Sequence, residues 1–159
     1  MYKNILLPTD GSPLSKKAIE SGIVFAKAIG AKVVGLYVSP KLSFHDILEI
    51  HEDEELWGSK EAERAKEALA HSEELGRSMA EKYLSSIEKK AKEAGLVCEK
   101  VYLSGESPAD GIIKTAEEKG CDLIFMASHG RTGISGALLG SVTMKVLGHS
   151  KVPVLVYRF

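Results

Sequence analysis

The sequence predicts an α/β fold in which a parallel β-sheet is sandwiched between helices. Short apolar runs alternate with longer segments of helical periodicity along most of the chain, in the order βαβαβαβαβ. This alternation implies right-handed crossovers and a sheet covered by helices on both faces. The chain has 159 residues, a length that suits one domain with a sizeable core rather than two domains. We therefore expect a single domain over residues 1–159.

Composition and charge exclude several classes of protein. There are 21 Lys and Arg residues against 22 Asp and Glu residues, with a formal net charge of −1. That balance argues against binding to nucleic acid or to a membrane surface, because both require excess positive charge. No apolar run is long enough to cross a bilayer, and the first residues do not resemble a signal peptide. Cys98 and Cys121 are too few for a disulfide framework and are expected to pack as small apolar residues. The sequence therefore predicts a soluble, cytoplasmic protein.

The first part of the chain predicts a strand, a helix and a second strand. Residues 2–8 form a short apolar run that ends in turn-forming residues. The helix that follows has Ser12 as its expected N-cap and Pro13 at its first position, where the missing N–H is not needed. Gly30 is expected to end this helix. Residues 32–38 are apolar almost throughout, which is typical of a strand covered on both faces.

A charged region follows the second predicted strand. Residues 39–59 mix acidic and apolar side chains and suggest a partly helical insertion, in which Phe44 and Trp57 suit either core packing or a lid. From about Ser59 to Ala94 the periodicity predicts a long charged helix, which Gly95 ends. The candidate buried positions of that helix are Ala62, Ala65, Leu69, Leu75, Met79, Leu84 and Ile87.

The last part of the chain predicts three further strands. Residues 97–103 and 122–127 are strand candidates, a helix opens at Ser107-Pro108, and another helix runs through Leu147. The final strand covers residues 152–157, and Pro153 at its start cannot donate to a ladder, so that an edge position is expected. Exposed edges are commonly covered by the same strand of a second copy. We therefore expect a homodimer formed through the C-terminal strand around Val154–Tyr157.

Two strand–helix junctions carry the chemistry of a ligand site. Ligands of open parallel sheets bind beyond the carboxyl ends of the strands, where the strand order reverses. Glycines let the backbone approach an anion closely, and a helix N-terminus adds unpaired amides and a positive dipole end. The spacing alone does not distinguish a phosphate-binding site from a glycine-rich turn that binds no ligand. The two junctions are Pro8-Thr9-Asp10-Gly11-Ser12 and Ala127-Ser128-His129-Gly130-Arg131-Thr132-Gly133, the second of which continues to Gly140-Ser141.

Two well-known phosphate-binding fingerprints are absent from the sequence. No G-x-x-x-x-G-K-[ST] motif occurs, so a Walker-type NTPase site is excluded. No G-x-G-x-x-G motif follows the first strand, where Gly11 is the single glycine, so a dinucleotide-binding Rossmann site is not supported.

Three motifs together resemble the universal stress protein family. The pattern Ser128-His129-Gly130, nine residues, then Gly140-Ser141-Val142 is similar to the family's ATP-binding signature, G-x-x-G, nine residues, G-[S/T]. Residues 5–12 and 152–156 are similar to the two termini of the family, so the resemblance covers essentially the whole chain. Ala127 stands where the signature has its first glycine. A methyl group there weakens binding if the position requires a positive φ and is tolerated if it requires only a close approach.

The resemblance implies a five-stranded parallel sheet of order 3-2-1-4-5, Rossmann-like and similar to the adenine nucleotide alpha hydrolases. It also implies an ATP site, in which Asp10 and Val38 lie around the base and ribose, the glycine loop holds the phosphates, and Mg²⁺ accompanies the triphosphate. The cofactor-binding residues that it implies are Pro8, Thr9, Asp10, Val38, Met126, Ala127, Ser128, His129, Gly130, Arg131, Gly133, Gly140, Ser141 and Val142.

The leading hypothesis is a homodimeric regulatory protein whose bound ATP marks its state, with at most slow hydrolysis. No nucleophile, base and orienting group occur together, as efficient hydrolysis requires. His129 is expected to stabilise its loop rather than act as a base. The alternatives are a slow ATPase or phosphotransferase that uses Asp10, and a nucleotide-free dimeric interaction module. No protein metal site is expected, because the remaining histidines of the acidic stretch lack a compact ligand spacing. These are His45, His51 and His71.

Overall fold

The computed structural model describes residues 1–39, 59–129 and 139–158, without the side chains of residues 59–62 and 65. Most of the expected insertion, with Phe44, His45, His51 and Trp57, lies outside the described residues, as do Gly130, Arg131 and Gly133. The elements are β1 (Asn4–Thr9), α1 (Pro13–Ile29), β2 (Lys32–Ser39), α3 (Ser59–Glu93), β3 (Cys98–Ser104), α4 (Pro108–Glu118), β4 (Leu123–Ala127), α5 (Ser141–His149) and β5 (Val154–Tyr157).

The five strands form one parallel sheet with the order β3-β2-β1-β4-β5, which confirms the expected order. The strand order reverses between β1 and β4. β1 pairs with β2 along its whole length, up to Thr9, whereas its pairing with β4 covers only Ile5 with Leu123 and Leu6 with Ile124. The carboxyl ends of β1 and β4 therefore extend beyond their shared ladder, at the place where ligands bind in such sheets.

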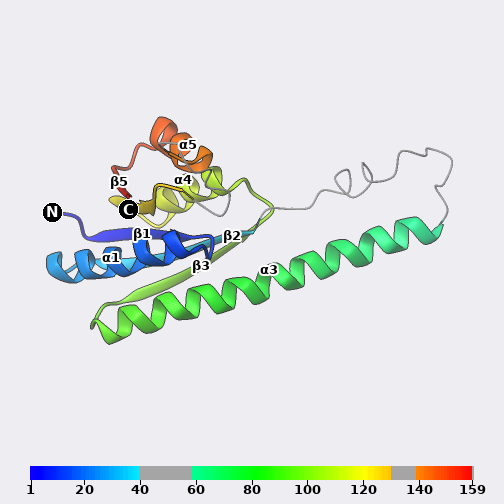
Figure 1. Cartoon of the computed structure of the whole chain (residues 1–159), viewed down its shortest axis with the longest axis horizontal. Coiled ribbons are helices and arrows are strands. Elements are labelled where there is room, and N and C mark those ends of the chain that lie inside the picture. The colour runs from blue at the N-terminus through cyan, green and yellow to red at the C-terminus, as the bar shows by residue number, and fades with distance from the viewer. Residues whose placement is uncertain (40–58, 130–138, 159) are drawn as a thin grey trace.

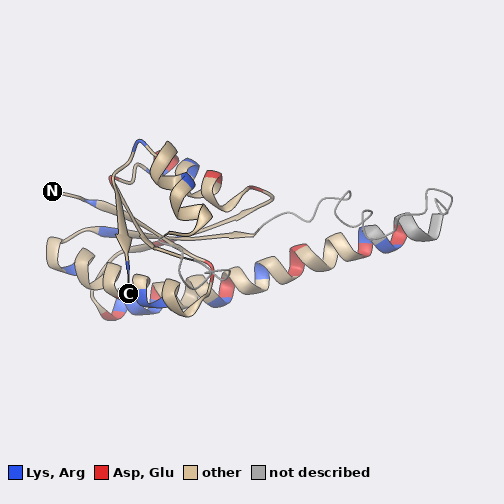
Figure 2. Cartoon of the chain, turned by 45° about the horizontal axis from the view of Figure 1, so that its top comes forward, with Lys and Arg blue, Asp and Glu red and all other residues tan. Residues whose placement is uncertain are grey.

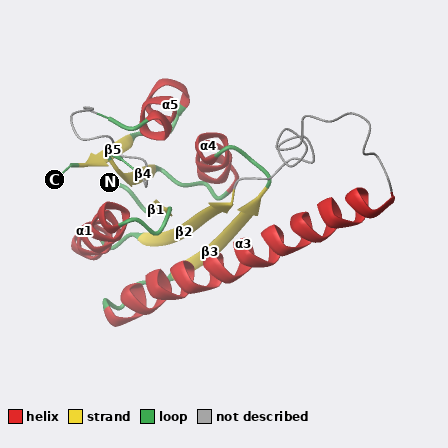
Figure 3. Ribbon diagram, turned by 45° about the vertical axis from the view of Figure 1, so that its right-hand side comes forward, coloured by secondary structure: helices red, strands yellow, loops and turns green. Residues whose placement is uncertain are grey.

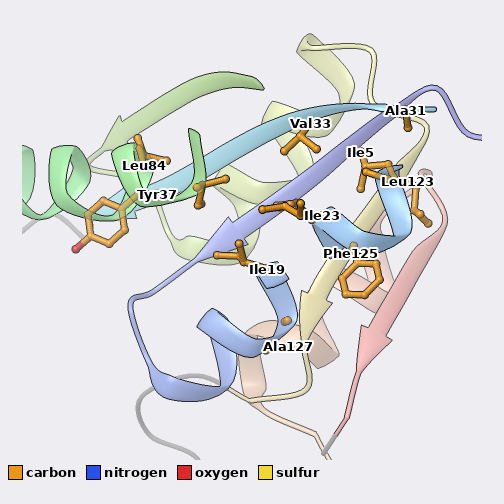
Figure 4. Packing of buried hydrophobic residues seen from close by; sticks show 14 of the residues in the cluster. Ile5, Ile19, Ile23, Ala31, Val33, Tyr37, Leu84, Leu123, Phe125 and Ala127 are labelled. Carbon is orange, nitrogen blue, oxygen red and sulfur yellow. The ribbon is translucent and has the colours of Figure 1, made fainter. Parts of the chain in front are cut away.

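Helices cover both faces of the sheet, as the sequence predicts. Helices α1 and α3 lie on one face and α4 and α5 on the other (Figure 1, Figure 3). Each face has its own cluster of buried apolar side chains, because successive residues of a strand point to opposite faces. On the first face, Ile5, Leu7 and Phe125 pack against Ile19 and Ile23 of α1 (Figure 4). On the second, the strand residues pack against α4 and α5, and this cluster contains Leu6, Val34, Leu36, Ile124, Met126, Ile112 and Val146.

The predicted helix ends are confirmed. The Ser12 hydroxyl accepts a 3.2 Å hydrogen bond from the Ser15 amide at the start of α1, and Pro13 occupies the first helical position. Gly30 ends the helix with φ +70°, a left-handed conformation that glycine adopts without steric cost. Ser107 caps α4 in the same way as Ser12 caps α1, through its side chain.

Some of the strand boundaries and one of the buried positions predicted from the sequence are wrong. β1 begins at Asn4 rather than at residue 2, and β5 begins at Val154, after Pro153. Leu75 is 51% exposed, although the helical spacing placed it among the buried positions of α3. Gly76 and Ala80 are buried in place of Leu75 and the half-buried Met79. The predicted burial of Leu84 and Ile87 is confirmed, and Ala91 continues the same face.

Helix α3 carries charges of both signs, and they are interspersed along its length (Figure 2). The Lys90 ammonium lies 2.8 Å from a Glu20 carboxylate oxygen on α1, and Lys100 of β3 lies 2.9 Å from Glu88 of α3. These pairs are solvent-exposed, so each contributes little to stability. Within the described ranges, no helix has the combination of length and apolar character that crossing a bilayer requires.

Candidate functional site

The turn after β1 is built by hydrogen bonds among its own polar residues. The Asp10 carboxylate Oδ1 accepts a 2.9 Å bond from the Ser12 amide, and the Thr9 hydroxyl accepts a 3.1 Å bond from the Gly11 amide. The Thr9 and Ser15 hydroxyls lie 2.8 Å apart. Asp10 is half-buried. The turn therefore holds one carboxylate, with one of its oxygens engaged by the chain, at the carboxyl end of β1.

The end of β4 keeps ordinary strand geometry through Ala127. This residue pairs with Tyr157 of β5, and none of the described non-glycine residues has a positive φ. Alanine therefore causes no backbone strain at the position where the family signature has its first glycine. The Thr143 hydroxyl, which is buried, donates a 3.1 Å hydrogen bond to the Ala127 carbonyl. Thr143 is not among the predicted site residues; a threonine in the first turn of the helix after a glycine loop is the signal that could have found it.

The start of α5 is tied to the end of β4. The Gly140 amide donates a 2.8 Å hydrogen bond to the Ser128 carbonyl, and the Ser128 amide donates a 2.9 Å bond to the Tyr157 carbonyl. The first of these bonds brings Ser128, at the end of β4, and Gly140, at the start of α5, together. The same bond engages the Gly140 amide, so the amides that remain for a ligand at this helix start are those of Ser141 and the residues after it.

Helix α5 begins without a side-chain cap. Its N-cap residue is Gly140, which makes no side-chain hydrogen bond to the first turn, in contrast to Ser12 and Ser107 at the starts of α1 and α4. The first turn of α5 carries no acidic side chain that would offset the positive end of the helix dipole. Ser141 is exposed and Val142 is half-buried. This arrangement suits an anion, because first-turn amides have no partner within the helix.

Ser128 and His129 contact each other, and Ser128 is buried whereas His129 is half-buried. The Ser128 hydroxyl lies 3.1 Å from His129 Nδ1, and Ser128 is only 2% exposed. Such a buried hydroxyl is a poor candidate for a nucleophile, because a reactant cannot reach it without opening the turn. The contact instead joins the His129 ring to the residue whose carbonyl accepts the Gly140 amide, which is the geometry of a residue that stabilises its loop.

The remaining expected residues differ in their surroundings. Pro8 is half-buried beside Leu36 in the β1–β2 ladder. Met126 is buried in the cluster on the α4–α5 face and is paired with Val156. Val38, at the end of β2, packs against that same cluster; a methyl group on Gly111 of α4 would lie 3.0 Å from a Val38 methyl. The side chains of Met126 and Val38 therefore serve packing.

A solvent-exposed ion pair links α5 to α4. The Lys145 ammonium lies 2.8 Å from Asp110 Oδ2. Hydrogen bonds from Lys145 and from the Ser107 hydroxyl lower the pKa of the Asp110 carboxyl. Among the described residues, no group of three His, Cys, Asp or Glu side chains is arranged to hold a metal ion.

The described part of the candidate site consists of the Asp10 turn, the end of β4 and the uncapped start of α5.

Comparison with known proteins gives one family. The family model described as "Universal stress protein family" matches residues 1–158. Universal stress protein MJ0531 of Methanocaldococcus jannaschii is 34% identical over 158 residues, covering 99% of this chain and 83% of that protein.

Solved structures agree in fold. The structure of MJ0577, a universal stress protein of Methanocaldococcus jannaschii, is 31% identical with a TM-score of 0.78 and covers 100% of this chain and 97% of that one. A universal stress protein in complex with cAMP is 25% identical with a TM-score of 0.62, covering 99% and 97% of the two chains. The strand order, the signature from Ser128 to Val142 and these matches agree, and the chain belongs to the universal stress protein family.

Proposed function

We propose that this protein binds an adenine nucleotide, ATP with Mg²⁺, between the Asp10 turn and the start of α5, and acts as a nucleotide-dependent regulatory protein. The observation that carries the proposal is the uncapped N-terminus of α5, held at the end of β4 by the bond from the Gly140 amide to the Ser128 carbonyl. Parallel neighbouring strands bring this helix start and Asp10 to the same edge of the sheet. A relative with the same fold in complex with cAMP supports a nucleotide as the ligand class.

The residues present fit a nucleotide better than they fit a metal ion alone. Backbone amides at the start of α5 would donate to phosphate oxygens, and the Asp10 carboxylate would face the ribose or the ion. Mg²⁺ usually keeps several waters and is bound by one or two carboxylates together with substrate phosphates. Mg²⁺ would therefore bind together with the triphosphate, whose charge it neutralises. In the described part of the site, Asp10 is the carboxylate that would contact the ion.

Hydrolysis is expected to be slow or absent. The Ser128 hydroxyl is buried and contacts His129, and the Asp10 Oδ1 is already engaged by the Ser12 amide. Neither group is arranged as a base that activates water. The bound nucleotide would then act as a state marker that changes the surface offered to a partner.

The proposal includes a homodimer formed through β5. This strand is one edge of the sheet, and its residues Val154–Tyr157 are all half-buried in the single chain. Pairing with the same strand of a second copy would cover this edge.

Isothermal titration of the full-length protein with Mg²⁺-ATP tests the proposal. We expect saturable binding and, at a ligand concentration of about 100 times Kd, a gain of about 2.7 kcal/mol in the free energy of unfolding. Parallel titrations with AMP and cAMP identify the preferred nucleotide. No heat of binding and no thermal stabilisation at millimolar ATP would reject the proposal.

The variant Asp10→Asn separates the charge of Asp10 from its structural bond. Asparagine keeps an oxygen that accepts from the Ser12 amide, whereas Asp10→Ala removes that acceptor as well. If the carboxylate binds the ion or the ribose, both variants should have lower affinity for the nucleotide. Only Asp10→Ala should also lose the hydrogen bond that holds the turn. Equal affinity of Asp10→Asn and the wild type would show that the negative charge of Asp10 does not act on the ion, and equal affinity of Asp10→Ala would remove Asp10 from the binding site.

A further inference from the structure

Tyr83 of α3 lies against the turn that carries Asp10. A methyl group added to Gly11 would lie 2.1 Å from Tyr83 Cζ and 2.5 Å from its Oη, which is far inside van der Waals contact. The ring therefore occupies the space that a side chain at position 11 would need. Tyr83 and Gly11 come from different elements, so this contact joins the long helix directly to the turn after β1.

The conformation of Gly11 determines how Asp10 is held. Gly11 has φ +78°, a left-handed conformation that other residues adopt only with strain. The two amides that flank the Gly11 Cα are both engaged: the Gly11 amide donates to the Thr9 hydroxyl, and the Ser12 amide donates to the Asp10 carboxylate. A change in the Gly11 backbone would therefore turn both amides and release the Asp10 Oδ1.

The position of Tyr83 is itself fixed by packing. Its ring centroid lies 5.5 Å from that of Tyr37 on β2, at an interplanar angle of 58°, and Tyr37 stacks at 6.2 Å on Tyr102 of β3. Figure 4 shows Tyr37 in the buried cluster together with Leu84, the residue after Tyr83. The ring thus cannot move away from Gly11 without disturbing the face of α3 that packs on the sheet.

We propose that Tyr83 is a positioning residue, which holds the Gly11 backbone and so orients the Asp10 carboxylate toward the nucleotide. This inference rests on the proposed function, because it names a further determinant of the same site. It makes nucleotide affinity dependent on the placement of α3, whose N-terminal part extends beyond the carboxyl ends of β2 and β3 (Figure 1, Figure 3). By thermodynamic linkage, bound nucleotide would in turn favour the position of α3 that places Tyr83 on Gly11.

The test compares Tyr83→Leu and Tyr83→Phe with Ile87→Ala as the matched control. Ile87 is buried one turn further along the same helix and packs on Gly35, away from the Asp10 turn. For each variant we would measure the Kd for Mg²⁺-ATP and, in the absence of nucleotide, the hydrogen-exchange rates of the Gly11 and Ser12 amides. The free energy of unfolding of each variant is measured as well, so that a general loss of stability can be recognised.

We expect Tyr83→Leu to raise the Kd and both exchange rates by about tenfold, a typical coupling between two sites. Tyr83→Phe keeps the Cζ and Cε1 side of the ring against Gly11, so both quantities should stay closer to the wild-type values than in Tyr83→Leu. Ile87→Ala should lower the free energy of unfolding while leaving the Kd unchanged. An unchanged Kd in folded Tyr83→Leu, or an equal rise in Ile87→Ala, would overturn the inference.

Gly11→Ala addresses the same contact from the other side if Tyr83→Leu does not fold. Its new methyl group meets the Tyr83 ring, so a combined Gly11→Ala and Tyr83→Leu variant should bind better than Gly11→Ala alone. The absence of such coupling would contradict the contact. If the wild type does not bind ATP, the proposed function fails, and the exchange rates of the Gly11 and Ser12 amides alone decide whether Tyr83 positions the turn.

Discussion

The Gly140 amide donates a 2.8 Å hydrogen bond to the Ser128 carbonyl, and this bond places the first turn of α5 at the carboxyl end of β4. Two consequences follow for the candidate site. Ser128 and Gly140 are held together at one end of the candidate site, and the amides at the start of α5 are presented without a side-chain cap. An uncapped helix start is less stable than a capped one, which favours a ligand that supplies the missing acceptor.

Substituting Gly140 should change stability and affinity in opposite directions. Gly140 has φ −73° and ψ 157°, a conformation open to any residue. In Gly140→Asp the new carboxylate would accept from first-turn amides and complement the helix dipole, raising the free energy of unfolding by about 0.5 kcal/mol. The same carboxylate would repel phosphate, and we expect the Kd for Mg²⁺-ATP to rise at least about tenfold. Urea unfolding and calorimetry measure the two effects.

Gly140→Asn is the control for this experiment, since asparagine caps a helix without a charge. It should raise stability in a similar way and weaken nucleotide binding less than aspartate does. Unchanged affinity in Gly140→Asp would show that the phosphates do not lie at the start of α5.

Restoring glycine at Ala127 should not improve nucleotide binding. Ala127 lies in a strand without a positive φ, is paired with Tyr157, and packs in the buried cluster of the α1–α3 face (Figure 4). Ala127→Gly should therefore lower the free energy of unfolding by about 0.5–1 kcal/mol, through the added flexibility of the unfolded chain, and change the Kd less than about twofold. A large gain in affinity would instead indicate that the alanine methyl group obstructs the ligand.

Val156→Pro should dissociate the proposed dimer without breaking the sheet of one chain. The carbonyls of Pro153 and Tyr157 accept hydrogen bonds from the amides of Ile124 and Ser128. Because alternate residues of a parallel strand bond to the same neighbour, the Val156 amide points toward the open edge. Proline removes that donor, so sedimentation should show a monomer, whereas Val156→Ala keeps the donor and should remain dimeric. A dimeric Val156→Pro protein would place the interface elsewhere.

The Cys121 thiol should make stability fall in alkaline solution. Burial raises the pKa of this thiol from its ordinary value of 9.0 to about 11. Between these values the unfolded thiol loses its proton while the folded thiol keeps it, so the stability present below pH 9 is lost as the pH rises toward 11. Cys121→Ala should remove a slope of at most about 1.4 kcal/mol per pH unit. Unfolding curves measured across this range for the two proteins should therefore diverge, and parallel curves would refute the raised pKa.

The alternation of apolar runs and helical segments determined which elements form and in which order, because both depend on short-range periodicity. The same holds for the helix ends at Ser12 and Gly30, where capping needs only neighbouring residues. Family resemblance supplied the strand order, which no local pattern contains. Local pattern and family motif together therefore account for most residues of the candidate site.

Only the tertiary structure decided how distant residues meet. The conformation of Ala127 depends on its pairing with Tyr157, and the exposure of Leu75 depends on which face of α3 meets the sheet. Tyr83 and Gly11 are in contact, although no motif or periodicity of the sequence includes both residues. A sequence motif describes local preference, whereas these features depend on how whole elements pack, and packing is set by all the side chains at an interface together.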